Sequence, residues 1–388
     1  MSYSGTLSPA RILDRPAEAV YQDDYRFWQG IPSIERTRGG RLYADWYSGM
    51  RTETGGNFVV VTISDDDGDT WESPRFVVMH DDPEVRVYDP CLWRDPEDRL
   101  WLTWNQSRDF YDGRVGAWVA VTENPDDDSP VWSEPIRIAD GLLMNKPTVL
   151  SSGEWLFPTA LWACHEPTED HGLQHLMFSN VTVSTDRGLT FEHRGSADVP
   201  NRSFDEHMIV EKEDGALWML VRCFDGIGES NSVDGGRTWT AGRRSHIDGP
   251  CSRFHIRRLA SGRLLMINHD GFAERSDRAD IEKQGNVKAW KGRSRLTALL
   301  SDDDGATWPH RLLLDERDEV SYPDAAITDD GSIAVVYDHD RFGDRAIYLA
   351  RFTEQDVLDG ALNSPRSAAA VLVNRAGAID PEPVASVS

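Results

Sequence analysis

Residue types suited to proton transfer stand beside cations at the starts of several short strand-like segments of this chain. The candidates are Asp89, Lys146, Asp205, Glu206, His207, Arg253, His255, Tyr322 and Asp324. Carboxylates, imidazoles and a phenol can exchange protons with a bound substrate, while arginine and lysine bind anionic or hydroxyl-rich groups. Burying so many charges is costly unless each finds a partner. We therefore expect these side chains to face one functional pocket.

The segments that must position these residues have the composition of β-strands. Runs such as RLYADWYSG (41–49), ALWMLVRC (216–223) and SIAVVYDHD (332–340) are rich in Trp, Val, Leu and Tyr and are bounded by turn residues. No long segment with helical periodicity precedes residue 354, and FTEQDVLDGAL (352–362) predicts one short helix. The predicted fold class is all-β.

A box of the form S-x-D-x-G-x-T-[WF] recurs along the chain. It occurs at 64–71, 184–191, 232–239 and 301–308, and a degenerate copy lies at 122–132. The Asp can accept backbone N–H bonds across a turn, and the Gly supplies a positive φ angle. The boxes predict structural turns and not calcium loops, because the EF-hand ligand spacing is absent. Successive boxes are about 50 to 70 residues apart, which is the size of a propeller blade with its loops.

These units predict a single domain over 1–388, a six-bladed β-propeller with four-stranded antiparallel blades. The expected blades cover 31–75, 86–135, 142–193, 203–243, 249–310 and 320–355. We expect 1–30 to supply the strand that closes the ring, and 354–388 to form a short helix and tail. Inner strands of a propeller all start at one mouth of the central channel, so the candidate residues should converge there. Four of the six starts carry an x-Pro step, which predicts extended backbone.

Four boxes in a six-unit all-β chain resemble the sialidase (neuraminidase) superfamily, whose members are six-bladed propellers. DEHMIVEKEDGALWMLVR matches the family's blade that opens on a glutamate and ends its next strand on an arginine. The resemblance implies that Glu206 polarises the nucleophile and that Arg222 is one of three arginines holding a substrate carboxylate. It implies that Tyr322, in VSYPD, is the nucleophile. A further arginine of the trio would be Arg293 or Arg295.

Two positions depart from the family pattern. Where an R-I-P motif gives the family its first arginine, this chain has Gly30 in WQGIPSIERT. The loop that should hold the acid/base aspartate, SGMRTETGGN, contains no Asp, and Glu53 or Arg51 is the nearest polar replacement. The strings FDEHMIVE and VSYPD are also similar to a divergent group of bacterial proteins of the sialidase family. We therefore do not expect a standard sialidase.

Glycoside cleavage needs an acid for the leaving oxygen and a nucleophile or base on the other face of the sugar. Tyr322 and Glu206 would form the nucleophile pair, with Glu206 taking the phenol proton. The candidates for the acid are His207, His255, Asp205 and Asp89. The expected substrate-binding residues are Arg222, Arg253, His255, Arg293, Lys146 and Asp324.

Three functions remain open at this point. The first is an exo-acting glycoside hydrolase that releases a terminal sugar, which can be acidic. The second is a polysaccharide lyase, in which Tyr322 and a histidine move a proton while Arg and Lys neutralise a uronate. The third is a carbohydrate-binding propeller without catalysis. An unsaturated product that absorbs in the ultraviolet separates the second function from the first.

The composition and net charge of the chain limit the classes of binding partner that we expect. The 388 residues carry a formal net charge of −25, so neither nucleic acid nor an anionic membrane surface is an expected partner. The four cysteines form no CxxC and suggest a reducing compartment. No signal peptide and no apolar run of membrane-spanning length is visible, so we expect a cytoplasmic protein that takes oligosaccharides. The histidines form no HExxH motif, and we expect neither a metal nor another cofactor.

Overall fold

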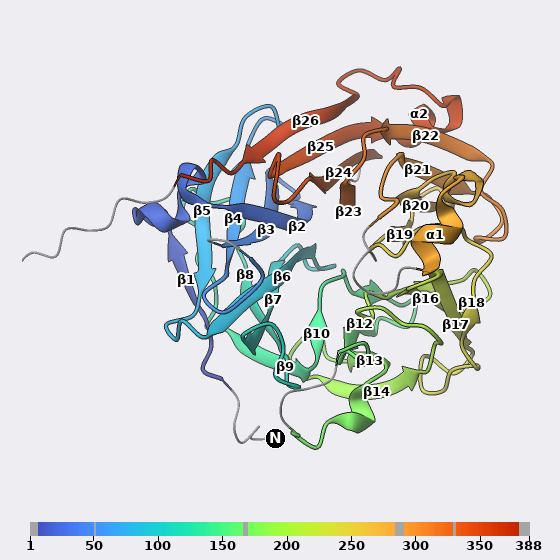
Figure 1. The fold of residues 1–388 in the computed structure, drawn as a ribbon, viewed down its shortest axis with the longest axis horizontal. Helices are drawn as coiled ribbons and strands as arrows, with labels where there is room; N and C mark the ends of the chain where they lie inside the picture. Colours follow the sequence, from blue (N-terminus) through green and yellow to red (C-terminus); the bar gives the residue numbers. More distant parts are fainter. Residues whose placement is uncertain (1–6, 50–51, 166–169, 284–290, 329–330, 380–388) are drawn as a thin grey trace, which may run out of the picture.

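The computed structural model describes residues 7–49, 52–165, 170–283, 291–328 and 331–379. Their strands form six antiparallel sheets, which follow one another in chain order round a central axis (Figure 1). The predicted six-bladed β-propeller is confirmed. Within the described residues no helix is long and apolar enough to cross a membrane.

Each blade runs from an inner strand at the channel to an outer strand at the rim. The first blade contains β2 (Trp28–Arg36), β3 (Leu42–Gly49), β4 (Phe58–Ser64) and β5 (Glu72–Met79). The second contains β6 (Val85–Arg94), β7 (Leu100–Arg108), β8 (Gly116–Thr122) and β9 (Ile136–Asp140). The third contains β10 (Leu142–Leu143), β11 (Thr148–Val149), β12 (Trp155–Ala160), β13 (Ser179–Ser184) and β14 (Glu192–Ala197).

The remaining three blades follow the same order. The fourth contains β15 (Met208–Glu211), β16 (Leu217–Cys223), β17 (Gly226–Ser232) and β18 (Arg243–Arg244). The fifth contains β19 (His255–Arg258), β20 (Leu264–His269), β21 (Leu296–Ser301) and β22 (His310–Asp315). The sixth contains β23 (Val320–Ile327), β24 (Ser332–His339), β25 (Ala346–Thr353) and β26 (Ala368–Arg375). The helices are α1 (Arg278–Lys283), α2 (Glu354–Asp359) and the 3₁₀ turns Ala19–Tyr21, Asp23–Tyr25, Gln174–Leu176 and Phe272–Glu274.

The two chain ends differ from the prediction. β1 (Arg11–Asp14) pairs with the outer strand β5 of the first blade, so the N-terminal segment adds a fifth strand there and does not complete the last blade. The last blade takes its own outer strand from β26, which follows α2 where we expected a tail. The two chain ends are joined by other hydrogen bonds instead: Arg26 and Gln29 both donate to Asn374 Oδ1 (2.6 and 3.0 Å), and the backbone nitrogen of Ala378 donates to the backbone oxygen of Arg26 (2.9 Å).

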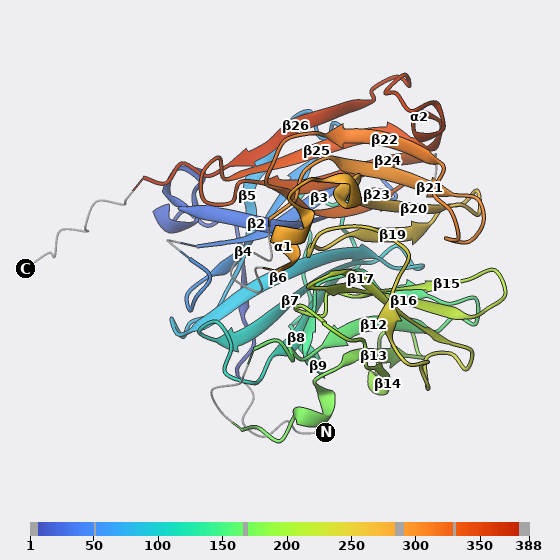
Figure 2. The ribbon, with the colours of Figure 1, turned by 45° about the vertical axis from the view of Figure 1, so that its right-hand side comes forward.

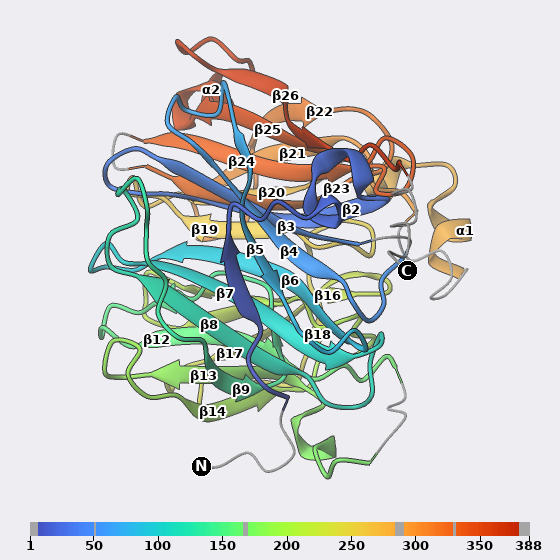
Figure 3. The ribbon, with the colours of Figure 1, turned by 90° about the vertical axis from the view of Figure 1, so that its left-hand side faces the viewer.

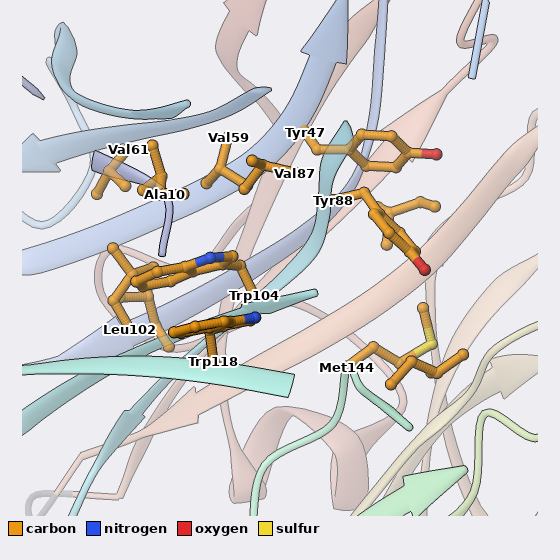
Figure 4. Packing of buried hydrophobic residues seen from close by; sticks show 14 of the residues in the cluster. Ala10, Tyr47, Val59, Val61, Val87, Tyr88, Leu102, Trp104, Trp118 and Met144 are labelled. Atoms are coloured by element: carbon orange, nitrogen blue, oxygen red, sulfur yellow. The ribbon is translucent and has the colours of Figure 1, made fainter. Parts of the chain in front are cut away.

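The hydrophobic core lies between neighbouring blades. Between the first two blades, Val59, Val87 and Leu102 are fully buried, and the rings of Tyr47 and Tyr88 lie 6.1 Å apart (Figure 4). Removing such apolar side chains from water is the main stabilising contribution to a fold of this kind.

The boxes are turns, as their sequence predicts. Each box serine is the last residue of a third strand, and in the first box Ser64 Oγ donates to Asp66 Oδ1 (2.8 Å). Asp66 also accepts from Thr70 N (2.8 Å) and Thr70 Oγ1 (2.6 Å). The same bonds to the aspartate recur at Asp186, Asp234 and Asp303. Third strands run parallel to first strands, so the boxes lie at the mouth opposite to the strand starts.

The mouth where the first strands start receives a second set of residues. The antiparallel second strands end there, so every loop between a second and a third strand opens at this mouth. α1, in the loop between β20 and β21, belongs to this mouth; it lies in front of the sheets in Figure 2 and projects from the ring at the right of Figure 3. Strand starts and these loops together form the site.

Candidate active site

Three of the x-Pro steps form β-bulges at this mouth. Ile31, Asp89 and Tyr322 each precede a proline and have φ angles of 59°, 46° and 54°. The pairing register shifts at each of these positions. The extended backbone predicted there is wrong, because the bulge places the residue in the left-handed region. Bulges of this kind redirect a side chain and are common beside active sites, where backbone strain of about 1–3 kcal/mol is retained.

The redirected side chains line a cavity of about 650 Å³. Five of the predicted site residues also line it: Asp89, Glu206, Arg222, Arg293 and Tyr322. The strand starts contribute Asp89, Glu206 and Tyr322, and the second strand β16 contributes Arg222 near its end. Arg293 comes from the loop before β21. The structure thus brings together residues that are far apart in the sequence.

Tyr322, Glu206 and Arg222 form the hydrogen-bonded centre of the cavity. Tyr322 Oη donates to Glu206 Oε1 (2.6 Å), and Arg222 Nη1 donates to both Glu206 Oε1 (2.6 Å) and Tyr322 Oη (2.7 Å). All three side chains are buried. Burial raises the pKa of Tyr322 above its ordinary value, so the phenol keeps its proton at neutral pH. It can become a nucleophile only by passing that proton to Glu206 as it reacts.

Arg293, and not its alternative Arg295, faces the cavity. Arg293 is buried and donates to the backbone oxygen of Cys251 (3.0 Å), whereas Arg295 is exposed. Burial and, next to it, the charge of the neighbouring Arg222 lower the pKa of the Arg293 guanidinium to about 10. Among the described residues no carboxylate lies within ion-pair distance of Arg293. Its charge is available to a bound anion.

Asp89 and Glu53 are two of the carboxyl residues that line the cavity, together with Glu206, Glu319 and Asp340. Burial raises the pKa of Asp89 to about 7; Arg86 opposes the shift, and Glu53 and Glu206 add to it. Asp89 Oδ1 has no hydrogen-bond partner in the described part of the chain. Glu53 lies 3.9 Å from Arg86 Nη1, through its Oε2 atom. Arg51, the other replacement named for the missing aspartate, lies outside the described residues.

Residues 40–335 match the family model of the BNR repeat-like domain. The chain belongs to this family. A sialidase from Bacteroides fragilis is 24% identical over 323 residues, which are 72% of this chain and 54% of that protein. The chain thus spans about half the length of the curated relative it matches.

Solved sialidase structures share the fold of this BNR repeat-like protein. The Hadza microbial sialidase Hz136 superposes with a TM-score of 0.65 at 20% identity, covering 87% of this chain and 68% of that one. The intramolecular trans-sialidase from Ruminococcus gnavus superposes with a TM-score of 0.61 at 14% identity, covering 93% and 100%. The predicted membership of the sialidase superfamily is confirmed, and at these identities the structural likeness shows the fold alone.

Four predicted substrate-binding residues of the BNR repeat-like protein lie in the channel and not in the cavity. Lys146 Nζ is 3.0 Å from Asp324 Oδ2, and His255 Nδ1 is 3.1 Å from Asp324 Oδ1. Arg253 Nη2 lies 3.6 Å from the same carboxylate. Burial would raise the pKa of Asp324, but Lys146 and then His255 hold it below its usual range. Asp324 comes two residues after the bulge at Tyr322. Its contacts with Lys146, Arg253 and His255 place its side chain in a buried ion network.

Asp205 and His207 also lie outside the cavity. Asp205 Oδ1 is 2.7 Å from Arg202 Nε and accepts a hydrogen bond from Ser179 Oγ (3.0 Å), and burial raises its pKa to about 6. Both ring nitrogens of His207 lie 2.8 Å from backbone oxygens. These contacts orient the start of the fourth blade, and with it Glu206.

Sequence reasoning missed the loop residues of the cavity. Besides Tyr322, five aromatic side chains line it: Phe110, Trp162, His165, Phe204 and Phe342. Trp162 and Phe204 rings pack edge to face at 5.2 Å, and Phe110 and His165 lie 5.2 Å apart. Arg341, between β24 and β25, also lines the cavity. The position of these loops in the chain could have indicated them, because each loop after a second strand must open at the mouth where the first strands start.

Within the described ranges no group of three or more His, Cys, Asp or Glu side chains is placed to hold a metal ion. The groups that can act on a substrate here are the phenol, the carboxyls and the guanidinium groups already described.

Proposed function

We propose that this protein is an exo-acting glycoside hydrolase of the sialidase superfamily, which releases a terminal sugar from an oligosaccharide. The observation that carries the proposal is the Tyr322–Glu206–Arg222 centre in a cavity of about 650 Å³. A buried phenol with a short bond to a buried carboxylate is a nucleophile paired with its base. The relative from Bacteroides fragilis, named a sialidase, supports the same class of reaction.

The geometry supports a two-step displacement. Tyr322 Oη attacks the anomeric carbon while its proton passes to Glu206 Oε1, and the bond from that carbon to the leaving oxygen breaks. Asp89 gives its proton to the leaving oxygen. Water then attacks the glycosyl-tyrosine and loses a proton to Asp89, and Glu206 returns the proton to the phenol. Arg222 donates to both oxygens of the pair and so keeps them aligned throughout.

The test is an activity screen of the native protein and two matched variants. A panel of aryl glycosides and natural oligosaccharides, including sialosides, uronides and deoxy-sugars, is read by released sugar and by ultraviolet absorbance. Tyr322→Phe removes the proposed nucleophile. Tyr337→Phe is the control, because Tyr337 is also buried and donates to a carboxylate, Asp315 Oδ2 (3.0 Å), but does not line the cavity.

We expect turnover by the native protein and by Tyr337→Phe, and a loss of at least about 10³-fold in Tyr322→Phe. An unsaturated product would show that the protein is a lyase and not a hydrolase. Sugar binding with no turnover across the panel would replace it by a carbohydrate-binding propeller.

A further inference from the structure

Arg341 occupies the space that a side chain at position 30 would need. A Cβ atom added to Gly30 would lie 2.6 Å from Arg341 Nε and 2.7 Å from Arg341 Cδ. Position 30 is where the resemblance to sialidases places an arginine, so one guanidinium is absent and another fills its place. Gly30 has no positive φ angle, and its small size is therefore explained by Arg341 and not by the backbone.

Arg341 is held rigidly in this place. Its Nε donates to Asp338 Oδ2 (2.8 Å), and Asp338 Oδ2 also accepts from the backbone nitrogen of Ile31 (2.8 Å). Asp338 is fully buried, so the bridge ties the last blade to the bulge of the first blade. The guanidinium carbon lies 4.2 Å from the centre of the Tyr322 ring.

Three guanidinium groups therefore surround the nucleophile. Those of Arg341, Arg293 and Arg222 lie 4.2, 5.3 and 6.0 Å from the Tyr322 ring centre. Arg293 Nε and Arg341 Nη2 are buried and have no hydrogen-bond partner in the described part of the chain. Among the described residues, Glu206 lies beside Arg222, and Asp338 and, at 3.8 Å, Glu53 lie beside Arg341, whereas Arg293 has no carboxylate within ion-pair distance. The centre therefore carries buried guanidinium donors that are unpaired among the described residues.

We infer that Arg341 is a specificity-determining residue, which completes with Arg222 and Arg293 a clamp for the carboxylate of a sugar acid. The last blade thus supplies the cation that the first blade lacks. The inference rests on the proposed function, because the clamp would hold the acid's reacting carbon against Tyr322. A carboxylate accepts paired hydrogen bonds from guanidinium groups and matches the unpaired donors found here.

The test measures equilibrium binding and needs no turnover. Calorimetry compares two free sugar acids, N-acetylneuraminate and glucuronate, each with its methyl ester, which removes the charge and changes little else. The variants are Arg341→Met, Arg341→Lys and Gly30→Ala, the last of which leaves the arginine in the chain but takes its space. Arg375→Met is the control, because Arg375 pairs with Asp344 (3.0 Å) in the same blade and does not line the cavity.

We expect the native protein and Arg375→Met to bind at least one acid about tenfold or more tightly than its ester. The preference should fall about tenfold in Arg341→Met, and Arg341→Lys and Gly30→Ala should each lose part of it. Circular dichroism and thermal unfolding check that each variant is folded. An unchanged preference in folded Arg341→Met, or no acid preference in the native protein, would overturn the inference.

The outcomes also separate this inference from the proposed function. If the protein binds sugar acids in a way that depends on Arg341 but turns over no glycoside, the clamp is supported and the proposed hydrolase function is contradicted. If the protein turns over neutral glycosides and Arg341→Met does not change the rate, the proposed hydrolase function is supported and the clamp is contradicted.

Discussion

Replacing Asp89 by Asn tests the identity of the general acid. Asp89 lines the cavity with an unpaired carboxyl oxygen, and burial raises its pKa to about 7. A group with this pKa is protonated in about nine tenths of molecules at pH 6 and in about one tenth at pH 8. If Asp89 protonates the leaving oxygen, kcat/KM should fall about tenfold per pH unit above pH 7.

The size of the loss should depend on the leaving group. For a natural oligosaccharide, whose leaving oxygen is strongly basic, Asp89→Asn should lower kcat/KM by about 10²- to 10⁴-fold. For an aryl glycoside with a weakly basic phenol the loss should be much smaller, because that oxygen can leave without a proton. The fall in rate above pH 7 should vanish in the variant. The assay is a pH profile of kcat/KM for both substrates between pH 5 and 9.

Two further variants decide whether the reasoning holds. Asp205→Asn is the matched control, because burial also raises the pKa of Asp205, to about 6, but this carboxyl lies outside the cavity. In Asp205→Asn, kcat/KM should still fall above pH 7 as it does in the native protein. Glu53→Gln tests a second carboxyl of the cavity, which lies in the loop where the family's acid/base aspartate is expected. The account of the acid is refuted if Glu53→Gln abolishes the alkaline fall and the dependence on the leaving group while Asp89→Asn keeps both.

Two stability predictions follow from the channel and from a box turn. Asp324→Asn should lower the free energy of unfolding at pH 7 by about 3–5 kcal/mol, since Lys146 and Arg253 stay buried without their shared carboxylate. Because the pKa of Asp324 is lowered in the folded state, its contribution to the free energy of unfolding is present above about pH 4 and is lost as the pH falls. The difference in urea unfolding between the native protein and the variant should therefore shrink in acid. A difference that does not depend on pH would contradict this. Gly188→Ala should be less stable than Gly153→Ala by about 1–3 kcal/mol, because both glycines have positive φ angles but only at Gly188 would the added Cβ meet an indole, 2.3 Å away. Equal urea midpoints for the two glycine variants would show that the box turn tolerates the extra atom.

The repeating parts of the fold could be predicted from the sequence because their causes are local. A box serine, aspartate and threonine satisfy one another within a single turn, so the pattern at 64–71 is visible without the rest of the molecule. The chain ends were not predicted correctly, since the pairing of β1 with β5 depends on contacts that the short run Arg11–Asp14 does not reveal.

The site was predicted in part, for the same physical reason. Residues directly at strand starts were found, but the side to which each points is decided by a bulge. Tyr322 and Asp324 are two residues apart, which in a regular strand would place them on one face. The left-handed backbone at Tyr322 sends its side chain to the cavity and leaves Asp324 in the channel. Arg341 carries no motif, and its role depends on the space above Gly30.

The central claim is that Tyr322 forms a covalent bond to the sugar during hydrolysis. The most direct measurement is peptide mass spectrometry after an acid quench of the native protein. The substrate is a fluorinated glycosyl fluoride of the sugar identified by the activity screen, because the added fluorine slows breakdown of the intermediate. We expect a glycosyl mass increment on the peptide that contains Tyr322, and none in Tyr322→Phe. Steady turnover with an unmodified Tyr322, and with Tyr322→Phe as active as the native protein, would contradict it.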